Sequence, residues 1–165
     1  MTVRVEPVSP EMRSTLEALF QLYVYDFSEM VGEDVDDDGR FPTPVLDPVW
    51  TDDRYLPCLL RAGDRLAGLA IVHRGSKLSG DAAVWDMAQF FVMRKYRRQG
   101  VGARAARLLF EAHPGPWEVR QISANTAANA FWRRVVGDYA GPAGWFETVL
   151  DGDRGTVQRF ASPPR

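Results

Sequence analysis

The chain has 165 residues and a formal net charge of −2, with 45% hydrophobic and 25% charged residues. This composition is typical of one soluble globular domain, residues 1–165, that buries a full core. The negative balance argues against a general nucleic-acid-binding protein, because sequence-independent binding to nucleic acid needs an excess of Lys and Arg. Only a local basic patch, at Arg94, Lys95, Arg97 and Arg98, leaves such binding open.

No long uncharged apolar run occurs, and the first residues lack the apolar core of a secretory signal, so we expect no membrane association. Cys58 is the only cysteine, which excludes an internal disulfide and a cysteine-cluster metal site. We therefore expect a cytoplasmic protein that carries no metal.

A short strand and a long amphipathic helix are the first elements predicted. Valines at 3, 5 and 8 indicate the strand, and Ser9-Pro10 combines an N-cap residue with a proline where helices tolerate it. Apolar residues then recur at three- and four-residue steps from about residue 10 to residue 29, which predicts one buried helix face. Residues 32–53 lose this periodicity and combine acidic residues with three prolines, which indicates a loop that could contain a short helix.

The remainder of the chain alternates strands and helices. We predict a hairpin from strands at 55–60 and 66–72, a long strand at 83–92, a helix after the glycines at 100 and 102, a strand at 117–122, a helix from 125 to a C-cap at Gly137, and a second hairpin from 145–150 and 156–160 with a turn at 151–155. The simplest architecture is a single mixed sheet flanked by helices. The edges of the last hairpin could pair with a second copy of the chain, so a homodimer is one expected assembly.

The junction between the strand at 83–92 and the next helix has the composition of a phosphate site. Glycines at 100 and 102 lack the Cβ atoms that would keep a ligand away from backbone N–H groups, and the helix that begins here offers unpaired N–H groups and its positive dipole end. Arg97 and Arg98 add two fork-shaped cationic donors. We expect an anion to bind at this junction.

Residues 91–102, FVMRKYRRQGVG, resemble the coenzyme A motif of the GNAT superfamily of acyl-CoA-dependent N-acetyltransferases. In that family a strand is followed by Gln or Arg, two variable residues, Gly, one variable residue, and Gly or Ala. Arg97, Gly100 and Gly102 satisfy this pattern. Short glycine patterns recur by chance, so the motif needs support from elsewhere in the chain.

A second motif supplies that support. Asn125, Ala128, Phe131 and Trp132, followed by Gly137, resemble the family's later motif, in which an Asn opens a helix that carries an aromatic pair and ends in glycine. The order of elements over nearly the whole chain also agrees with the family. The resemblance implies an α/β (α+β) fold with a single mixed, mostly antiparallel sheet of about seven strands flanked by helices, and an acyltransferase that uses acetyl-CoA as co-substrate.

The resemblance also implies where coenzyme A binds. The pyrophosphate would be held, mostly by backbone amides, at Arg97, Arg98, Gln99, Gly100, Val101 and Gly102. The main chain of Phe91, Val92 and Met93 would bind the pantetheine arm, and one of its N–H groups would polarise the thioester carbonyl. Asn125 would bond the arm from the other side.

Transfer to an amine requires a neutral amine, because a protonated one has no lone pair for attack on the thioester. Deprotonating a lysine-like amine at neutral pH costs about 4 kcal/mol, so a nearby base or a desolvating cleft is needed. Asp86, on the strand that leads to the glycine junction, is our candidate, since several family members place a glutamate there. The alternative role for Asp86 is an ordinary ion pair near the start of its strand.

Trp132 departs from the family pattern. Many members have a tyrosine there whose hydroxyl protonates the leaving thiolate, and an indole N–H is too weak an acid for this role. Tyr139, Tyr23, Tyr25 or water could replace it. Alternatively, Trp132 packs against the acyl-CoA arm, and the protein is a non-catalytic acyl-CoA-binding sensor or regulatory module.

The acceptor has no motif of its own. Tyr23, Tyr25, Asp26 and Glu29 place polar groups near the end of the first helix and could line an acceptor pocket. The acidic run that follows, residues 33–38, is either a solvated surface or a segment that attracts a cationic acceptor. That acceptor would be a small molecule or a peptide amine. The leading prediction is therefore N-acetyltransfer to a primary amine by direct attack in a ternary complex.

Overall fold

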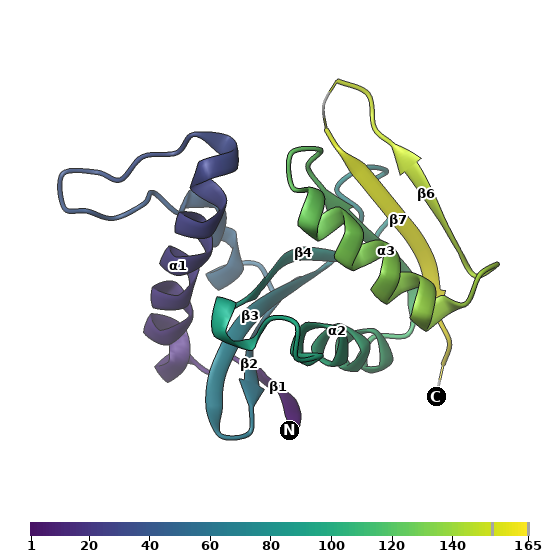
Figure 1. Ribbon diagram of the computed structural model, residues 1–165, viewed down its shortest axis with the longest axis horizontal. Helices are drawn as coiled ribbons and strands as arrows, with labels where there is room; N and C mark the ends of the chain where they lie inside the picture. Colours follow the sequence, from purple (N-terminus) through teal and green to yellow (C-terminus); the bar gives the residue numbers. More distant parts are fainter. Residues whose placement is uncertain (153, 165) are drawn as a thin grey trace. The chain divides into compact units, whose positions relative to one another are not determined.

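The computed structural model describes residues 1–152 and 154–164, and its strands form one mixed sheet in the order β1-β2-β3-β4-β5-β7-β6. The strands are β1 (Val3–Pro7), β2 (Tyr55–Ala62), β3 (Arg65–Arg74), β4 (Trp85–Val92), β5 (Gly115–Gln121), β6 (Trp145–Val149) and β7 (Thr156–Ser162). Three α-helices accompany them, α1 (Arg13–Val31), α2 (Val101–Ala112) and α3 (Thr126–Ala140) (Figure 1). The predicted seven-stranded mixed sheet flanked by helices is confirmed.

The chain divides into two compact units, which we describe separately. The first unit contains Met1–Ile71 and Gln89–Gly102, and the second contains Val72–Ala88 and Ala103–Arg165. Among the described residues, no helix is long and apolar enough to cross a membrane.

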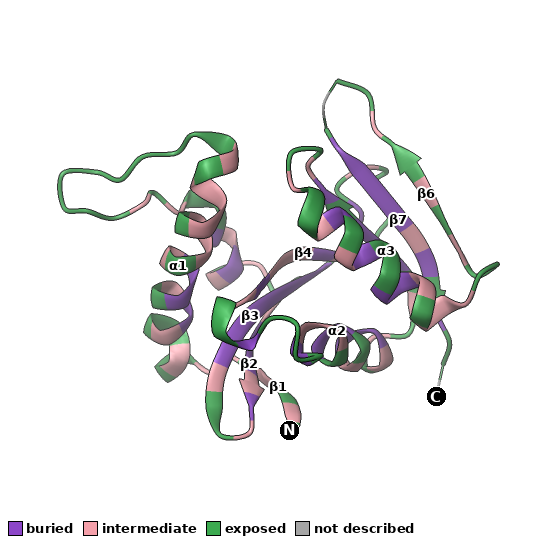
Figure 2. Ribbon diagram, viewed as in Figure 1, coloured by how far each residue is buried: buried purple, intermediate pink, exposed green. Residues whose placement is uncertain are grey.

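In the first unit, helix α1 carries the aromatic core that the periodicity predicted. Leu16, Leu19 and Phe20 are buried, and Tyr23 lies edge-on to Phe20 with ring centroids 5.3 Å apart. Figure 2 shows that buried and exposed residues alternate along α1. A 3-10 turn, η1 (Pro10–Met12), precedes the helix, which ends at Gly32 in the left-handed conformation (φ 72°). Strand β1 pairs antiparallel with β2.

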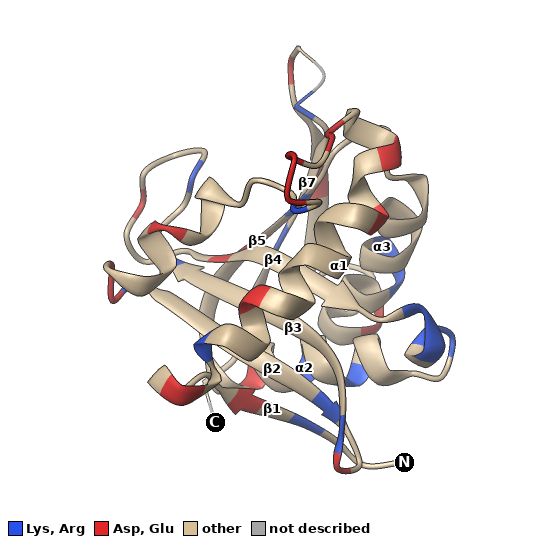
Figure 3. Cartoon of the chain, turned by 90° about the vertical axis from the view of Figure 1, so that its left-hand side faces the viewer, with Lys and Arg blue, Asp and Glu red and all other residues tan. Residues whose placement is uncertain are grey.

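The loop after α1 contains the predicted short helical structure as two 3-10 turns, η2 (Pro44–Leu46) and η3 (Pro48–Trp50). The loop is tied to α1 by the Gln21 side chain, which donates to the Phe41 carbonyl and accepts from the Phe41 N–H, both at 2.9 Å. Figure 3 shows that acidic residues gather along this loop, as the composition indicated.

In the second unit, β7 lies between β5 and β6, antiparallel to both, and β4 pairs with β5 in parallel. Helix α3 contacts β5, β6 and β7. An aromatic cluster fills the core of this unit, with Phe110 of α2 at 4.9 Å from Trp117 and 4.7 Å from Phe160 between ring centroids. The second predicted hairpin is confirmed, and Asp153 in its turn lies outside the described residues.

The predicted end of the helix at Gly137 is wrong, because α3 continues to Ala140 and is capped by Gly141. A Cβ atom on Gly137 would stand 3.5 Å from Nε1 of Trp145. That distance is an ordinary van der Waals contact, so neither packing nor a positive φ requires glycine here, and a glycine inside a helix looks the same in sequence as one that ends it.

Candidate functional site

The glycine junction is a turn in the first unit that contains left-handed residues. Between β4 and α2 the chain makes a 3-10 turn, η4 (Arg94–Tyr96), and then places Arg98 (φ 61°) and Gly100 (φ 78°) in the left-handed region. Left-handed residues interspersed in such a turn point successive N–H groups toward a common centre, the geometry that binds phosphate. Val101, which begins α2, is buried and fixes the helix start beneath this turn. The local geometry fits a pyrophosphate group.

The two arginines of this junction differ in what they do. Arg97 donates from Nε to the Val92 carbonyl at 2.7 Å and from Nη2 to the Asp26 carboxylate on α1, and its guanidinium lies 5.7 Å from the Phe91 ring centroid. Arg98 is exposed and makes no ion pair among the described residues. The Arg97 side chain therefore links the end of β4 to α1, whereas the Arg98 side chain is available to a ligand.

Asp26 pairs with two arginines of this junction. Besides Arg97, it accepts from Arg94, whose Nη2 is 2.7 Å from Oδ1. Partial burial opposes the charge on Asp26, but hydrogen bonds and charges from Arg97 and Arg94 outweigh it and hold the pKa below its usual range. An acceptor amine would have to displace these guanidiniums to use Asp26.

The end of β4 approaches β3 very closely. A Cβ atom on Gly68 would stand 1.9 Å from the Phe91 carbonyl oxygen, so only glycine fits there. The Met93 N–H donates to the Ala67 carbonyl at 2.8 Å. Of the three residues predicted to bind the pantetheine arm, Met93 therefore has its N–H already engaged.

Asn125 and Trp132 belong to the second unit. The Asn125 Oδ1 accepts from the Ala128 N–H at 3.0 Å and caps α3, while its Nδ2 donates to no described residue, so the amide retains a donor for a ligand. Trp132 is 5% exposed, with its ring centroid 6.4 Å from that of Phe110. Its indole thus belongs largely to the core of this unit.

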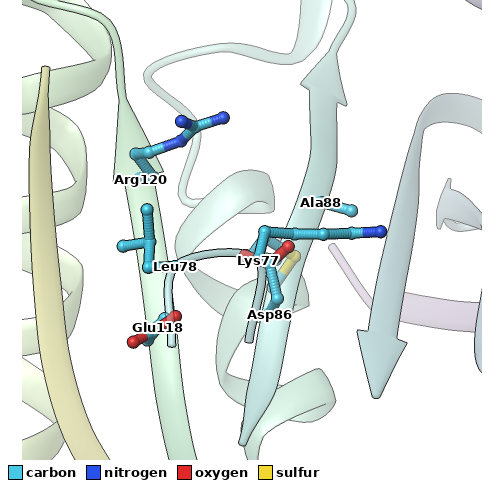
Figure 4. Close-up of a pocket in the computed structure, with 7 residues that line it drawn as sticks. Lys77, Leu78, Asp86, Ala88, Glu118 and Arg120 are labelled. Atoms are coloured by element: carbon cyan, nitrogen blue, oxygen red, sulfur yellow. The ribbon is translucent and has the colours of Figure 1, made fainter. Parts of the chain in front are cut away.

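Asp86 lines a polar pocket in the second unit with an empty volume of about 380 Å³. The pocket lies between β4, β5 and the turn that follows β3, and it is lined by Lys77, Leu78, Asp86, Met87, Ala88, Glu118 and Arg120 (Figure 4). Asp86 is the register partner of Glu118 on the neighbouring parallel strand. The alternative role as an ion-paired strand residue finds no salt bridge at Asp86 among the described residues.

This environment favours the protonated form of Asp86. Burial raises its pKa, and the negative charge of Glu118 raises it further, to about 6, although Arg120 and Lys77 pull in the other direction. A carboxylate with this pKa is ionised at neutral pH and is a stronger base than an ordinary aspartate. Among the described residues, no group of three or more His, Cys, Asp and Glu side chains is placed to hold a metal ion.

The partners of Asp86 were not predicted from the sequence. Glu118 and Arg120 alternate with apolar residues in the predicted strand at 117–122, which places them on one face of that strand. Which residue of β4 lies opposite them depends on the register of a parallel pair distant in sequence, and the pattern does not specify that register.

The predicted acceptor residues divide into two groups. Tyr25, Asp26 and Glu29 line a second pocket in the first unit together with Ser28, Gly32, Glu33, Asp34 and Arg94. Tyr23 is not among them, because its ring stacks on Phe91 with centroids 5.4 Å apart. Three of the four residues thus share one acidic pocket at the end of α1.

A family model described as the acetyltransferase (GNAT) family matches residues 16–137. The comparison with curated protein sequences gave no match. Among solved structures, an acetyltransferase from Thermus thermophilus has a TM-score of 0.70 at 17% identity, covering 99% of this chain and 97% of that one. An aminoglycoside acetyltransferase solved with coenzyme A and kanamycin has a TM-score of 0.67 at 13% identity, covering 97% and 95%. A spermidine N-acetyltransferase from Vibrio cholerae, solved with coenzyme A and spermine, has a TM-score of 0.61 at 10% identity, covering 95% and 92%.

Proposed function

Because the chain belongs to the GNAT acetyltransferase family, we propose that it moves the acetyl group of acetyl-CoA to a primary amine by direct attack in a ternary complex. Asp86, a carboxyl whose pKa is raised to about 6 on the strand that leads to the glycine turn, is the observation that carries this proposal. It supplies the base that an ammonium acceptor needs.

In the proposed reaction the acceptor nitrogen forms a bond to the thioester carbonyl carbon as the carbon–sulfur bond breaks. Before the attack, the ammonium form of the acceptor gives one proton to Asp86, directly or through a water. After the attack, the nitrogen releases a second proton to water, and the sulfur leaves as a thiolate. Deprotonation of a lysine-like amine at neutral pH costs about 4 kcal/mol. Partial burial of Asp86 lowers this cost, because a buried carboxylate gains more from taking up a proton than an exposed one does.

The donor would be held at its pyrophosphate by the N–H groups of the 97–102 turn and by the exposed Arg98 side chain. The N–H of Phe91 or Val92 would polarise the thioester carbonyl, and the Nδ2 of Asn125 would bond the pantetheine arm. Trp132 would contact the donor only through the edge of its ring that the core leaves uncovered.

The leaving thiolate does not obtain its proton from Tyr139 in this proposal. The Ser162 Oγ donates its single proton to the Phe110 carbonyl at 2.8 Å, so in its 2.7 Å contact with Ser162 the Tyr139 hydroxyl must be the donor. Burial raises the pKa of Tyr23 to about 12, far above the value of about 8.5 for a thiol, which makes Tyr23 a poor acid for a thiolate. Tyr25 or water therefore remains as the source of this proton.

The acceptor in this proposal is cationic. Glu29, Glu33 and Asp34 line the acidic pocket at the end of α1 and form no salt bridge among the described residues, so an ammonium group could pair with them. Two of the solved structures with this fold contain kanamycin and spermine, both of which carry several amines. Polyamines and aminoglycosides are therefore the first acceptors to test.

The deciding experiment is a free-thiol release screen with acetyl-CoA and a panel of polyamines, aminoglycosides, amino acids and basic peptides. Cys58 is buried, and burial raises the pKa of its thiol to about 11, so the protein adds little thiol background. We expect release stimulated by cationic amines. If no acceptor in a broad panel stimulates release while acetyl-CoA still binds, the acyl-CoA sensor replaces the enzyme.

A further inference from the structure

Glu118 has no role in the proposed reaction, yet it is a carboxylate that is only 5% exposed. Buried carboxylates are rare in proteins unless they are paired. Among the described residues, each of its two oxygens has one partner, since Oε2 accepts from the Ser76 hydroxyl at 2.7 Å and Oε1 accepts from Arg159 Nε at 3.0 Å. Both contacts fix the carboxylate in one orientation within the second unit.

Ser76 itself is held in place by the turn after β3. Its Oγ accepts from the N–H groups of Leu78 and Ser79, at 3.0 and 2.9 Å, while its hydroxyl proton goes to Glu118. Ser76 is 6% exposed. Ser76 thus links the turn to the Glu118 carboxylate. The same turn contains Lys77, which lines the pocket of Asp86.

Glu118 also lies directly across from Asp86. The two residues are register partners on the parallel strands β4 and β5, and both line the same pocket (Figure 4). A negative charge at this short range disfavours a second negative charge in partly buried surroundings. The other charged groups of the second unit that face Asp86 are Arg120 on β5 and Lys77 on the turn, and Arg159 of β7 stands behind Glu118.

We propose that Glu118 is a positioning residue for the transfer, in that its carboxylate, held opposite Asp86 by Ser76 and Arg159, sets how readily Asp86 takes the proton from the acceptor amine. The inference rests on the proposed function, because it takes Asp86 as the base. Two charges would then act on the protonation of Asp86 in opposite directions. The negative charge of Glu118 favours the protonated form of Asp86, and the positive charge of Arg159 weakens that effect because it pairs with Glu118.

This balance predicts opposite effects for two substitutions. Glu118→Gln removes the negative charge but keeps the side-chain shape, so Asp86 should titrate at a pH lower by about one unit. Arg159→Gln removes the compensating charge, so Asp86 should take up its proton at a higher pH than in the unchanged protein. Simple loosening of the strands would move both variants in the same direction.

The test is a pH titration of the Asp86 carboxyl carbon by NMR, with the signal assigned by its loss in Asp86→Asn. The matched control is Glu111→Gln, which removes a carboxylate of the same unit from the exposed pair with Arg107 and should leave the Asp86 titration unchanged. The low-pH limb of kcat/KM, measured with the best acceptor, should follow the same shifts. An Asp86 titration that is unchanged or moved upward in Glu118→Gln overturns the inference.

Two further outcomes keep the inference separate from the proposed function. If Glu118→Gln does not fold, the Arg159→Gln titration tests the inference alone, and a downward or absent shift there overturns it. If Asp86→Asn retains full activity, the base assignment fails, whereas the NMR titration still reports whether Glu118 controls the proton affinity of Asp86.

Discussion

Arg97 is bound by Asp26, so the guanidinium of the first residue of the glycine motif contacts helix α1. The contact joins two segments of the first unit that are distant in sequence. It gives the adjacent arginines at 97 and 98 different tasks, one structural and one available for a ligand.

We expect Arg97→Gln and Arg98→Gln to separate stability from donor binding. Arg97→Gln removes the hydrogen bonds from Arg97 to the Asp26 carboxylate and to the Val92 carbonyl. This loss should lower the melting temperature of the free protein by several degrees. Arg98→Gln should leave that temperature nearly unchanged and weaken coenzyme A binding about 3- to 10-fold, the loss of one exposed charge contact. Thermal melts and isothermal titration check both, and the opposite assignment of effects would refute the two roles.

Gly100→Glu should abolish the stabilisation that acetyl-CoA gives. A ligand at 100 times its Kd adds about 2.7 kcal/mol to the free energy of unfolding, and a carboxylate at this position would repel the pyrophosphate. Gly63→Glu is the matched control, because Gly63 also has a positive φ (60°) and a Cβ atom added there would meet no atom within 4 Å. Differential scanning fluorimetry should show the ligand shift in the control and none in Gly100→Glu. An intact shift in both variants would remove the donor from this turn.

Asp86→Asn should reduce kcat/KM about 10²-fold or more, the usual loss of a general base. It should also remove the decline in rate below about pH 6 that protonation of Asp86 causes. Asp138→Asn, an exposed carboxylate on α3, is the control and should retain both rate and pH profile. A pH profile of Asp86→Asn that matches the unchanged protein would exclude Asp86 as the base.

The same substitution should raise stability at neutral pH. The folded pKa of Asp86, about 6, lies above its unfolded value of about 3.9, so the folded state binds the proton more tightly. This contribution to stability is complete below about pH 4 and is lost as pH rises through 6. Asp86→Asn avoids the cost of a buried charge, and its advantage over the unchanged protein should grow by about 2–3 kcal/mol between pH 4 and pH 8. Urea unfolding at both pH values measures this difference, and an equal difference at the two would contradict it.

Glu29→Gln and Glu33→Gln should raise the KM for a cationic acceptor while the KM for acetyl-CoA stays constant. Both residues line the acidic pocket of the first unit, and the attraction they supply should weaken as salt is added. Glu17→Gln, on the exposed pair with Arg13 at the start of α1, is the control. Equal effects on both substrates, or an effect independent of salt, would argue against an acceptor site here.

Much of the fold could be predicted because it depends on local patterns. The three- and four-residue spacing of Leu16, Leu19 and Phe20 specifies a helix face, and the glycines and prolines mark turns. Most predicted boundaries differ from the observed ones by one or two residues, and the larger error at Gly137 arose because a glycine inside a helix looks the same in sequence as one that ends it.

The sequence by itself determined the order of elements, the glycine turn and the resemblance to an acetyltransferase family, because each depends on residues close together in the chain. Only the tertiary structure decided what those residues touch. In the structure Arg97 binds Asp26, the Met93 N–H donates to the Ala67 carbonyl, and Glu118 lies opposite Asp86. Strand register and side-chain direction decide such contacts, and they come from packing between segments far apart in sequence.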